Sequence, residues 1–277
     1  MEKNIIGKLA EDYPQLYLNP DTDSQEEYRR VVLRGEEPER KSLEHYTGDP
    51  YDRLENADTP AGPVRVATLG SRRDFELVVR GLMAAKSGPL AEVPESQGAA
   101  MMKLFNWPRI HAHVAAYPEE EQAEEFKRFT AVKENYIDIL VVLSRGPYSH
   151  VEAVPGAAGE KWLALSDTIR RWHELTHAVC RRLYPEDVHA VRDELIADAV
   201  GLYAAFGRFD PETEKLFLGI RDGRYTGGRL GNYAEVTDEL TGAVCRALDR
   251  IRELIDERPP EDPFDLIPRL MEQKYSL

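Results

Sequence analysis

The chain has 277 residues, of which 42% are apolar and 31% are charged, and its formal net charge at pH 7 is −14. This is the composition of a soluble globular protein, long enough for one large domain or two small ones with a real hydrophobic core. The acidic excess argues against partners that present phosphate groups, so we expect neither nucleic acid nor an anionic membrane surface as a partner. The longest apolar stretch, residues 139–143, is far too short to span a bilayer.

The amino-terminal segment and the cysteines bear on the cellular compartment. The first 15 residues include early acidic residues and lack the apolar core of a signal peptide. The two cysteines, Cys180 and Cys245, lie in partly apolar segments with helical patterning. We therefore expect two buried free thiols in a reducing compartment, and a cytoplasmic location.

Residues 1–62 are rich in Pro, Glu and Arg and weakly apolar, which predicts a partly irregular N-terminal extension with one short amphipathic helix within 26–46. We expect one domain from residue 63 to residue 277. Its first half is predicted to contain a strand at 64–69, a helix from the N-cap Ser71 to about 85, a helical segment at 99–113 interrupted by Pro108, a charged helix at 119–134 and a strand at 137–144.

The second half is dominated by helical patterns. The predicted elements are helices at 167–183 and 187–206 joined by the short link 184–186, a Gly-rich segment at 222–233, a helix at 235–256 and a short C-terminal helix. Few strands and many helices predict an α+β fold, mostly helical, with a small sheet.

The sequence His173-Glu174-Leu175-Thr176-His177 forms an H-E-x-x-H motif inside the first of these helices. Positions four apart lie on the same face of a helix, so both imidazoles can point at one ion. Glu174 is offset around the helix, where it can reach a metal-bound water rather than the metal. A catalytic zinc site needs three protein ligands and an open position, so a third ligand is expected elsewhere.

The second helix offers that ligand. Glu194 and Asp198 lie four residues apart on a face whose other residues are apolar. His177 lies about 9 Å before the end of the first helix, and Glu194 about 10.5 Å after the start of the second, taken at Asp187 as its N-cap. An antiparallel hairpin therefore brings Glu194 level with His177, and Asp198 level with His173. A metal and a histidine N–H would then offset the cost of placing two carboxylates on an apolar face.

The H-E-x-x-H of residues 173–177, followed by the E-x-x-x-D of residues 194–198, resembles the gluzincin branch of zinc metallopeptidases. The resemblance covers about 40 residues, from 165 to 206. The 16 residues between the two motifs place this chain at the short end for the group. The longer H-E-x-x-H-x-x-G-x-x-H pattern is absent, which argues against the three-histidine branch.

The resemblance implies a zincin-like fold with the small sheet beside the motif helix. It implies that Zn²⁺ is held by His173, His177 and Glu194, and that Asp198 supports the first histidine. Glu174 would be the general base that activates a zinc-bound water. The implied activity is that of a zinc-dependent hydrolase, a metallopeptidase acting on a peptide or protein.

Two further features would complete such an active site. Tyr225, Arg229 and Tyr233 in the Gly-rich segment are candidates for stabilising the oxyanion, although this segment also fits an exposed connection. The strand at 137–144 fits an edge strand that pairs with an extended peptide, and equally fits an ordinary core strand.

Other functions stay open at the level of sequence. The protein could be a metallohydrolase that acts on a non-peptide amide. It could instead be a zincin-like metal-binding protein without peptidase activity, in an interaction or regulatory role. The simplest alternative has no metal, and pairs the acidic residues of the two helices with Arg170, Arg171 or Arg192.

Overall fold

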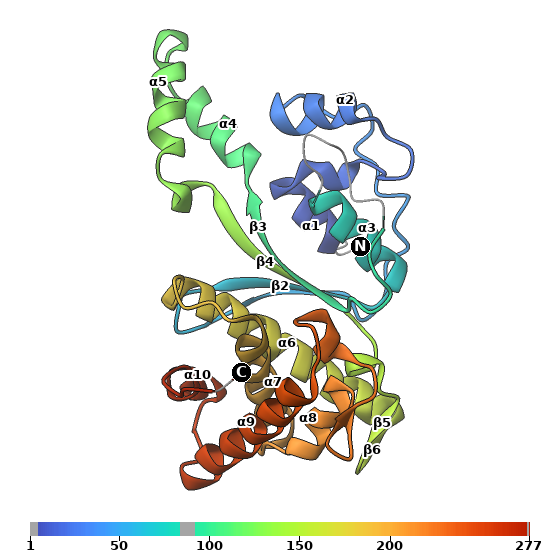
Figure 1. Ribbon diagram of the computed structural model, residues 1–277. Helices are drawn as coiled ribbons and strands as arrows, with labels where there is room; N and C mark the ends of the chain where they lie inside the picture. Colours follow the sequence, from blue (N-terminus) through green and yellow to red (C-terminus); the bar gives the residue numbers. More distant parts are fainter. Residues whose placement is uncertain (1–4, 84–91, 276) are drawn as a thin grey trace. The chain divides into compact units, whose positions relative to one another are not determined.

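The computed structural model describes residues 5–83, 92–275 and 277. It shows an α+β fold that is mostly helical (Figure 1). The chain forms two compact units, one from residues 1–57 and 65–144 and the other from residues 58–64 and 145–277. This division differs from the boundary near residue 62 that the sequence suggested. None of the described helices combines the length and apolarity needed to cross a bilayer.

The first unit combines a sheet with short helices. Its elements in chain order, with the first residue of β2 shared with the other unit, are α1 (Ile5–Asp12), η1 (Pro14–Tyr17), α2 (Gln25–Tyr28), η2 (Arg29–Leu33), β1 (Arg53–Ala57), β2 (Val64–Leu69), α3 (Arg72–Leu82), β3 (Ala99–Phe105), α4 (Trp107–Ala115), α5 (Glu119–Thr130), η3 (Lys133–Asn135) and β4 (Ile137–Ser144). The predicted strands at β2 and β4 and the predicted helix at α5 are confirmed. Ser71 caps α3 as predicted, by accepting a hydrogen bond from the backbone N–H of Asp74. The expected end of that helix near residue 85 lies outside the described residues.

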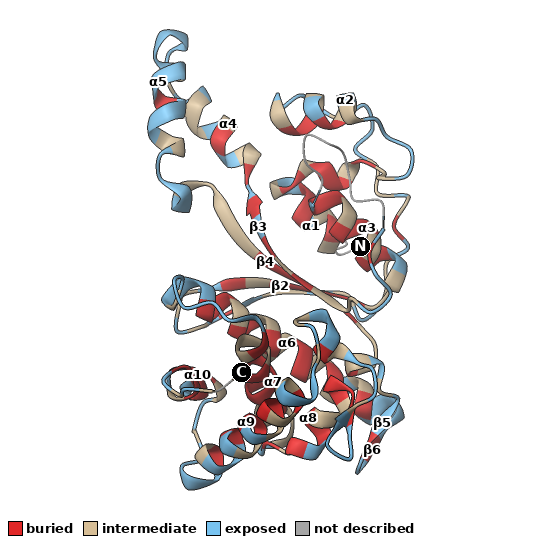
Figure 2. Ribbon diagram, viewed as in Figure 1, coloured by how far each residue is buried: buried red, intermediate tan, exposed pale blue. Residues whose placement is uncertain are grey.

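The sheet has the strand order β1-β2-β4-β3, with β4 parallel to β2 and antiparallel to β3. Residues 140–143 of β4 are at most 1% exposed, as its run of β-branched and apolar residues leads one to expect (Figure 2). Because β2 and β3 occupy both sides of β4, the idea that this strand pairs with an extended substrate is wrong. Its backbone hydrogen bonds are used within the sheet, so the alternative, a core strand, holds.

The expectation of an irregular extension is wrong for residues 5–17. Ile6, Leu9, Tyr13 and Leu16 are at most 1% exposed and form one core with Ala67, Leu69, Leu140 and Val142 of the sheet. Apolar residues three or four apart place this face of α1 and η1 inward. The charged residues between them lower the apolar content of the segment, but its apolar residues still recur at helical spacing.

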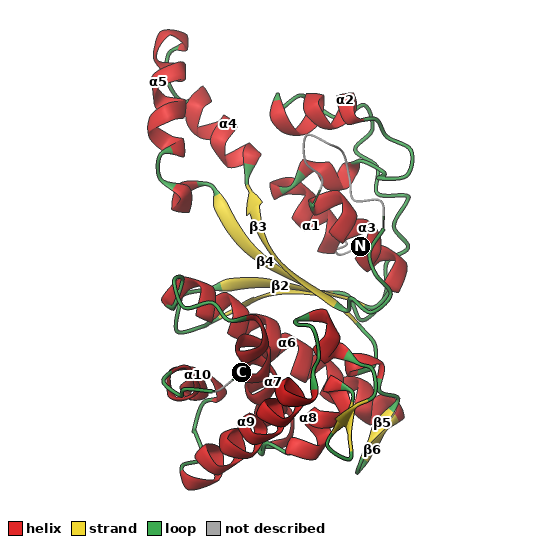
Figure 3. Ribbon diagram, viewed as in Figure 1, coloured by secondary structure: helices red, strands yellow, loops and turns green. Residues whose placement is uncertain are grey.

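Residues 99–105 were expected to be helical and instead form β3 (Figure 3). Alternate residues Ala100, Met102 and Leu104 are buried, which is the period of a strand. Asn106 then caps α4 by accepting from the backbone N–H of Arg109. Pro108 lies in the first turn of α4, where no N–H is needed, so it begins a helix rather than interrupting one.

The second unit is a helical assembly with two short hairpins. Its elements in chain order are η4 (Tyr148–His150), β5 (Ala153–Val154), β6 (Ala157–Ala158), α6 (Gly159–Leu183), α7 (Ala190–Phe206), α8 (Pro211–Leu218), β7 (Ile220–Arg221), β8 (Arg224–Tyr225), η5 (Arg229–Asn232), α9 (Asp238–Glu257), η6 (Pro263–Asp265) and α10 (Leu266–Met271). The sequence predicted α6, α7, α9 and α10, but not α8. The segment 58–64 belongs here, since Arg182 of α6 donates to the carbonyls of residues 61–63 at 3.1–3.4 Å.

The hairpin of α6 and α7 is the centre of this unit. α7 begins at Ala190, with His189 rather than Asp187 as its N-cap, because Asp187 instead accepts from the side chain of Arg192. Gly201 lets the two helices approach closely: a Cβ on it would lie 2.7 Å from the carbonyl oxygen of Ile169. That contact lies one turn from the H-E-x-x-H motif.

Candidate metal centre

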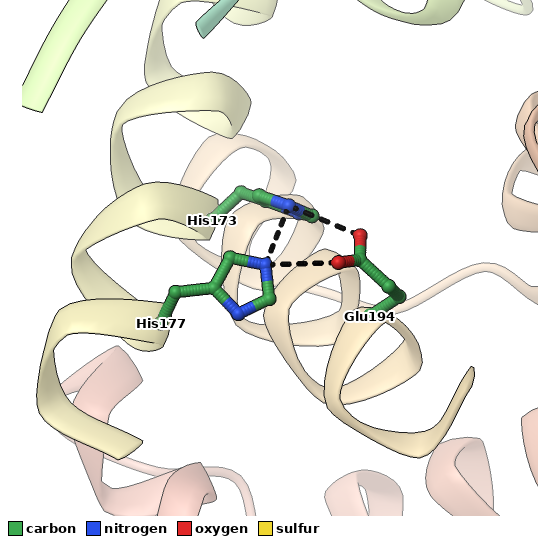
Figure 4. A group of neighbouring side chains, drawn as sticks. All are labelled: His173, His177 and Glu194. Atoms are coloured by element: carbon green, nitrogen blue, oxygen red, sulfur yellow. Dashed lines mark hydrogen bonds and ion pairs between the residues drawn. The ribbon is translucent and has the colours of Figure 1, made fainter. Parts of the chain in front are cut away.

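Three side chains from α6 and α7 converge on one point (Figure 4). Nε2 of His173 lies 3.0 Å from Nε2 of His177. One carboxylate oxygen of Glu194 lies 3.4 Å from Nε2 of His173, and the other lies 3.2 Å from Nε2 of His177. The structure thus brings Glu194 beside His177, as the hairpin count predicted, and adds His173 from the same motif.

The cluster is buried on one side and partly open on the other. The side chain of His173 is 8% exposed, whereas those of His177 and Glu194 are 15% and 17% exposed. Burial raises the pKa of Glu194, but hydrogen bonds from the two histidines outweigh it and hold that pKa well below its usual range. The carboxylate is therefore negatively charged and faces two imidazole nitrogens.

Behind the cluster, Asp198 fixes the orientation of His173. Nδ1 of His173 lies 2.7 Å from Oδ1 of Asp198, which is fully buried. A carboxylate can only accept, so Nδ1 of His173 carries a proton. In the neutral imidazole, which is the form that binds a metal, Nε2 then presents its lone pair to the cluster, whereas the protonated ring donates from Nε2 to Glu194. The side chain of Asp198 lies at the level of His173, as the sequence indicated.

Two residues from other segments join this contact. Tyr148 donates to Oδ1 of Asp198 at 2.5 Å, and its hydroxyl oxygen lies 3.0 Å from Nδ1 of His173. Arg229 donates from Nη1 to that hydroxyl oxygen at 2.6 Å, and its Nη2 forms an ion pair with Oδ2 of Asp198. Burial raises the pKa of the Tyr148 phenol, so it stays protonated and able to donate.

Glu214 of α8 is a second carboxylate in this region. It is fully buried, and neither of its oxygens has a hydrogen-bond partner among the described residues. Nη2 of Arg229 lies 3.7 Å from Oε1, beyond hydrogen-bond distance, and is already paired with Asp198. Burial, followed by the negative charge of Glu194, raises the pKa of Glu214 well above its usual value.

Glu174, the expected general base, follows His173 on α6 and is partly exposed. Among the described residues, no side chain lies within hydrogen-bond or ion-pair distance of its carboxylate. Adjacent helical positions differ by about 100°, so Glu174 faces beside the cluster rather than into it. Its carboxylate is thus available to a small molecule or a substrate.

The three oxyanion candidates have different surroundings. Tyr225 donates to the carbonyl oxygen of Gly228 and accepts from the backbone N–H of the same residue, so its hydroxyl is used locally. Arg229 lies on the Nδ1 side of His173, away from the cluster. Burial raises the pKa of the Tyr233 phenol, and so does the nearby negative charge of Glu194. Of the three, Tyr233 is the one that lies near Glu194 and has a hydroxyl group without a local hydrogen-bond partner among the described residues.

The metal-free alternative named three arginines as partners for the acidic residues. Arg170 donates to the carbonyls of residues 146 and 147, and Arg192 pairs with residues 187 and 193. Arg171 lies over the ring of Trp172 at 5.9 Å. The ion-pair partners of Glu194 within the described part of the chain are the two histidines.

Sequence reasoning did not anticipate the roles of Tyr148 and Glu214. Tyr148 lies in a turn-rich loop with no motif, 25 residues before His173. Glu214 lies in a short helix whose neighbours Glu212 and Lys215 are charged, and it therefore resembles a solvated residue. Only the folded arrangement distinguishes these two from ordinary loop and surface positions.

One protein family matches residues 3–256 of the chain, and its description is "Family of unknown function (DUF7005)". No curated protein and no solved structure matches the chain.

Proposed function

The chain belongs to DUF7005, a family of unknown function, and we propose that it is a zinc-dependent hydrolase that cleaves peptide bonds. His173, His177 and Glu194 would hold the ion, and Glu174 would act as the general base. The observation that supports this best is the convergence of two imidazole nitrogens and one carboxylate within 3.4 Å of one another.

The spacing and chemistry of these atoms fit zinc. Four-coordinate zinc with bonds of about 2.0–2.1 Å separates its ligand atoms by roughly 3.3–3.4 Å. The two imidazole nitrogens are 3.0 Å apart, and they lie 3.2 and 3.4 Å from different oxygens of the Glu194 carboxylate. With one ligand atom from each residue, the three atoms lie within 4.8 Å of one another. Two histidines and one glutamate are a known catalytic zinc set, and the partial exposure of His177 leaves room for an open position.

The reaction would use the residues of the chain as follows. When bound, zinc would polarise the scissile carbonyl and lower the pKa of a water molecule toward neutrality. Glu174, with no competing partner among the described residues, would accept the proton of the attacking water and deliver it to the leaving amine. Tyr233, held neutral by burial, would donate a hydrogen bond to the developing oxyanion.

We assign the chain to the gluzincin type with a zincin-like fold on the same grounds. A helix bearing H-E-x-x-H packs against a helix bearing E-x-x-x-D, and the aspartate of the second motif contacts the first histidine. Two free cysteines, one buried and one partly buried, accord with a reducing compartment, so we place the enzyme in the cytoplasm.

The test of this function is Glu174→Gln, which keeps the size of the side chain and removes its basicity. We expect the variant to keep about one zinc per chain and to lose hydrolysis of a broad peptide library by about 10²–10⁴-fold. Zinc content is measured by elemental analysis and hydrolysis by mass spectrometry of the peptides. The exposed Glu186→Gln is the matched control and should retain both properties.

Two results would refute this function. One is hydrolysis by Glu174→Gln at the wild-type rate, which would show that Glu174 is not the general base. The other is a zinc-loaded wild-type protein that cleaves no peptide in the library, which would leave a metal-binding protein without peptidase activity.

A further inference from the structure

We propose that Tyr148 and Arg229 form a clamp that positions His173 for metal binding. This inference rests on the proposed metal centre and assigns positioning roles to two residues outside both motifs. It also replaces the oxyanion role that the sequence suggested for Arg229.

The contacts of the clamp converge on one nitrogen atom. Asp198 and Tyr148 both approach Nδ1 of His173, at 2.7 and 3.0 Å. One guanidinium group, that of Arg229, contacts both of these partners, through Nη1 to Tyr148 and through Nη2 to Asp198. The clamp therefore acts on the edge of the imidazole opposite Nε2, the atom that faces the cluster.

The clamp is enclosed by protein. Tyr148 is 4% exposed, Asp198 is fully buried, and the side chain of Arg229 is 15% exposed. In such an environment hydrogen bonds are strong. When one partner is removed, no water molecule replaces it, and the remaining polar groups lose a hydrogen bond. The position of the His173 ring thus depends on all three partners together.

The loop that contains Tyr148 has an unusual backbone conformation and is held in place by hydrogen bonds to α6. Ser149 and His150 follow it with φ of 52° and 58°, a left-handed conformation that residues other than glycine rarely adopt. The loop is held by α6: Ser166 accepts from the backbone N–H of Tyr148 at 3.0 Å, and Trp162 donates to the carbonyl of Val151 at 2.5 Å. Strained backbone that the surrounding structure enforces is common at functional sites.

The segment that presents Arg229 is fixed independently. Gly228 packs against Gly219 so closely that a Cβ on either residue would lie within 2.7 Å of the other's backbone. Thr226 donates its backbone N–H to the carbonyl of Gly219 at 2.8 Å. These contacts anchor the turn before Arg229 to the end of α8. Two separately anchored segments therefore meet where Arg229 contacts Tyr148, next to the Asp198 carboxylate that holds His173.

The experiment compares Tyr148→Phe with Tyr203→Phe as matched control. Tyr203 lies on α7, and its hydroxyl donates to the carbonyl of Pro260, away from the cluster. Zinc affinity is measured by competition with a chromophoric chelator, and ligand geometry by the visible spectrum of the Co²⁺-loaded protein. We expect Tyr148→Phe to bind zinc about 10–100-fold more weakly, with altered Co²⁺ bands, and Tyr203→Phe to match the wild type.

Arg229→Lys is the second variant, and it carries the test if metal-free Tyr148→Phe does not fold. Lysine keeps the charge but lacks the planar fork that reaches Tyr148 and Asp198 at once. A loss of zinc affinity similar to that of Tyr148→Phe is expected.

Wild-type affinity and Co²⁺ bands in folded Tyr148→Phe would overturn the clamp, and so would an equal loss in Tyr203→Phe. If Tyr148→Phe does not fold, wild-type behaviour of Arg229→Lys overturns it instead. A wild-type protein that binds neither metal refutes the proposed metal centre itself, and the clamp with it.

Discussion

Glu214 is a fully buried carboxyl group whose pKa differs between the folded protein and the unfolded chain. Burial and the charge of Glu194 raise its pKa well above the ordinary value of 4.5. The folded protein therefore binds this proton more tightly than the unfolded chain does. Its contribution to the free energy of unfolding is full below pH 4.5 and is lost as pH rises through the raised pKa.

Glu214→Gln should remove this dependence, because glutamine resembles the protonated side chain. In metal-free protein we expect the variant to gain stability relative to the wild type as pH rises from 5 to 8. The midpoint of urea unfolding at the two pH values measures the difference. Glu212→Gln, two residues earlier on α8 and exposed, is the control and should show no such trend. If the unfolding midpoints of wild type and Glu214→Gln differ by the same amount at both pH values, the pKa of Glu214 is not raised in the folded protein.

At the residue scale, the sequence was sufficient for groups that follow helical spacing. His173, His177, Glu194 and Asp198 are set by two four-residue intervals and one hairpin, so their heights can be counted. Tyr148 and Glu214 could not be found in this way. The contacts of Tyr148 join segments 25 to 81 residues apart, and no local pattern encodes them or the burial of Glu214.

The helix pair α6 and α7 is the element on which the centre depends. Gly201 of α7 faces the carbonyl of Ile169 of α6, and a Cβ would approach it to 2.7 Å. The nearest atom is a backbone carbonyl oxygen, which cannot move aside as the end of a flexible side chain can. The two helices must therefore separate to make room for the methyl group of an alanine. Separation would displace Glu194 from the two histidines.

Gly201→Ala should therefore destabilise the protein by about 1–3 kcal/mol and weaken zinc binding. The control is Gly242→Ala on α9, where the nearest atom is the flexible end of Arg246 at 3.4 Å. That change should stabilise the protein by about 0.5–1 kcal/mol, since alanine is the better helix former. Chemical denaturation measures both. Equal effects of the two substitutions would refute the close crossing as a requirement.

At the element scale, helices and strands with a strong local pattern were predicted correctly. The type or position of the remaining elements depends on their contacts with other parts of the fold. β4 was identified as a strand, but only pairing shows that it is central rather than at an edge. Residues 99–105 are mostly good helix formers, and pairing with β4 makes them a strand. α8 is eight residues long, too short to produce a distinct periodic pattern.

At the scale of the whole molecule, the proposed ligands and the clamp all lie in the unit of residues 58–64 and 145–277. The division into units could not be predicted, because the segment 58–64 joins that unit through contacts with Arg182, 119 residues or more away. The net charge of −14 led us to expect no partner that presents phosphate groups, but it did not indicate the site. The placement of a few buried carboxylates is more informative.

Zinc should protect the two units unequally. Binding to the folded state stabilises it by about 2.7 kcal/mol at a concentration 100 times Kd. We expect added zinc to slow amide hydrogen exchange in α6 and α7 and around Tyr148 and Arg229, and to leave β2, β3 and β4 unchanged. Mass spectrometry of peptides with and without zinc measures this. Protection concentrated in the strands would contradict the assignment of the site.

The most direct test of the account is the metal content of the protein purified without added zinc. We expect about one zinc per wild-type chain, none in His177→Ala, and an unchanged content in His189→Ala, whose histidine only caps α7. A wild-type protein that contains no zinc, and whose melting temperature does not rise when zinc is added, would show that residues 173, 177 and 194 form no zinc site.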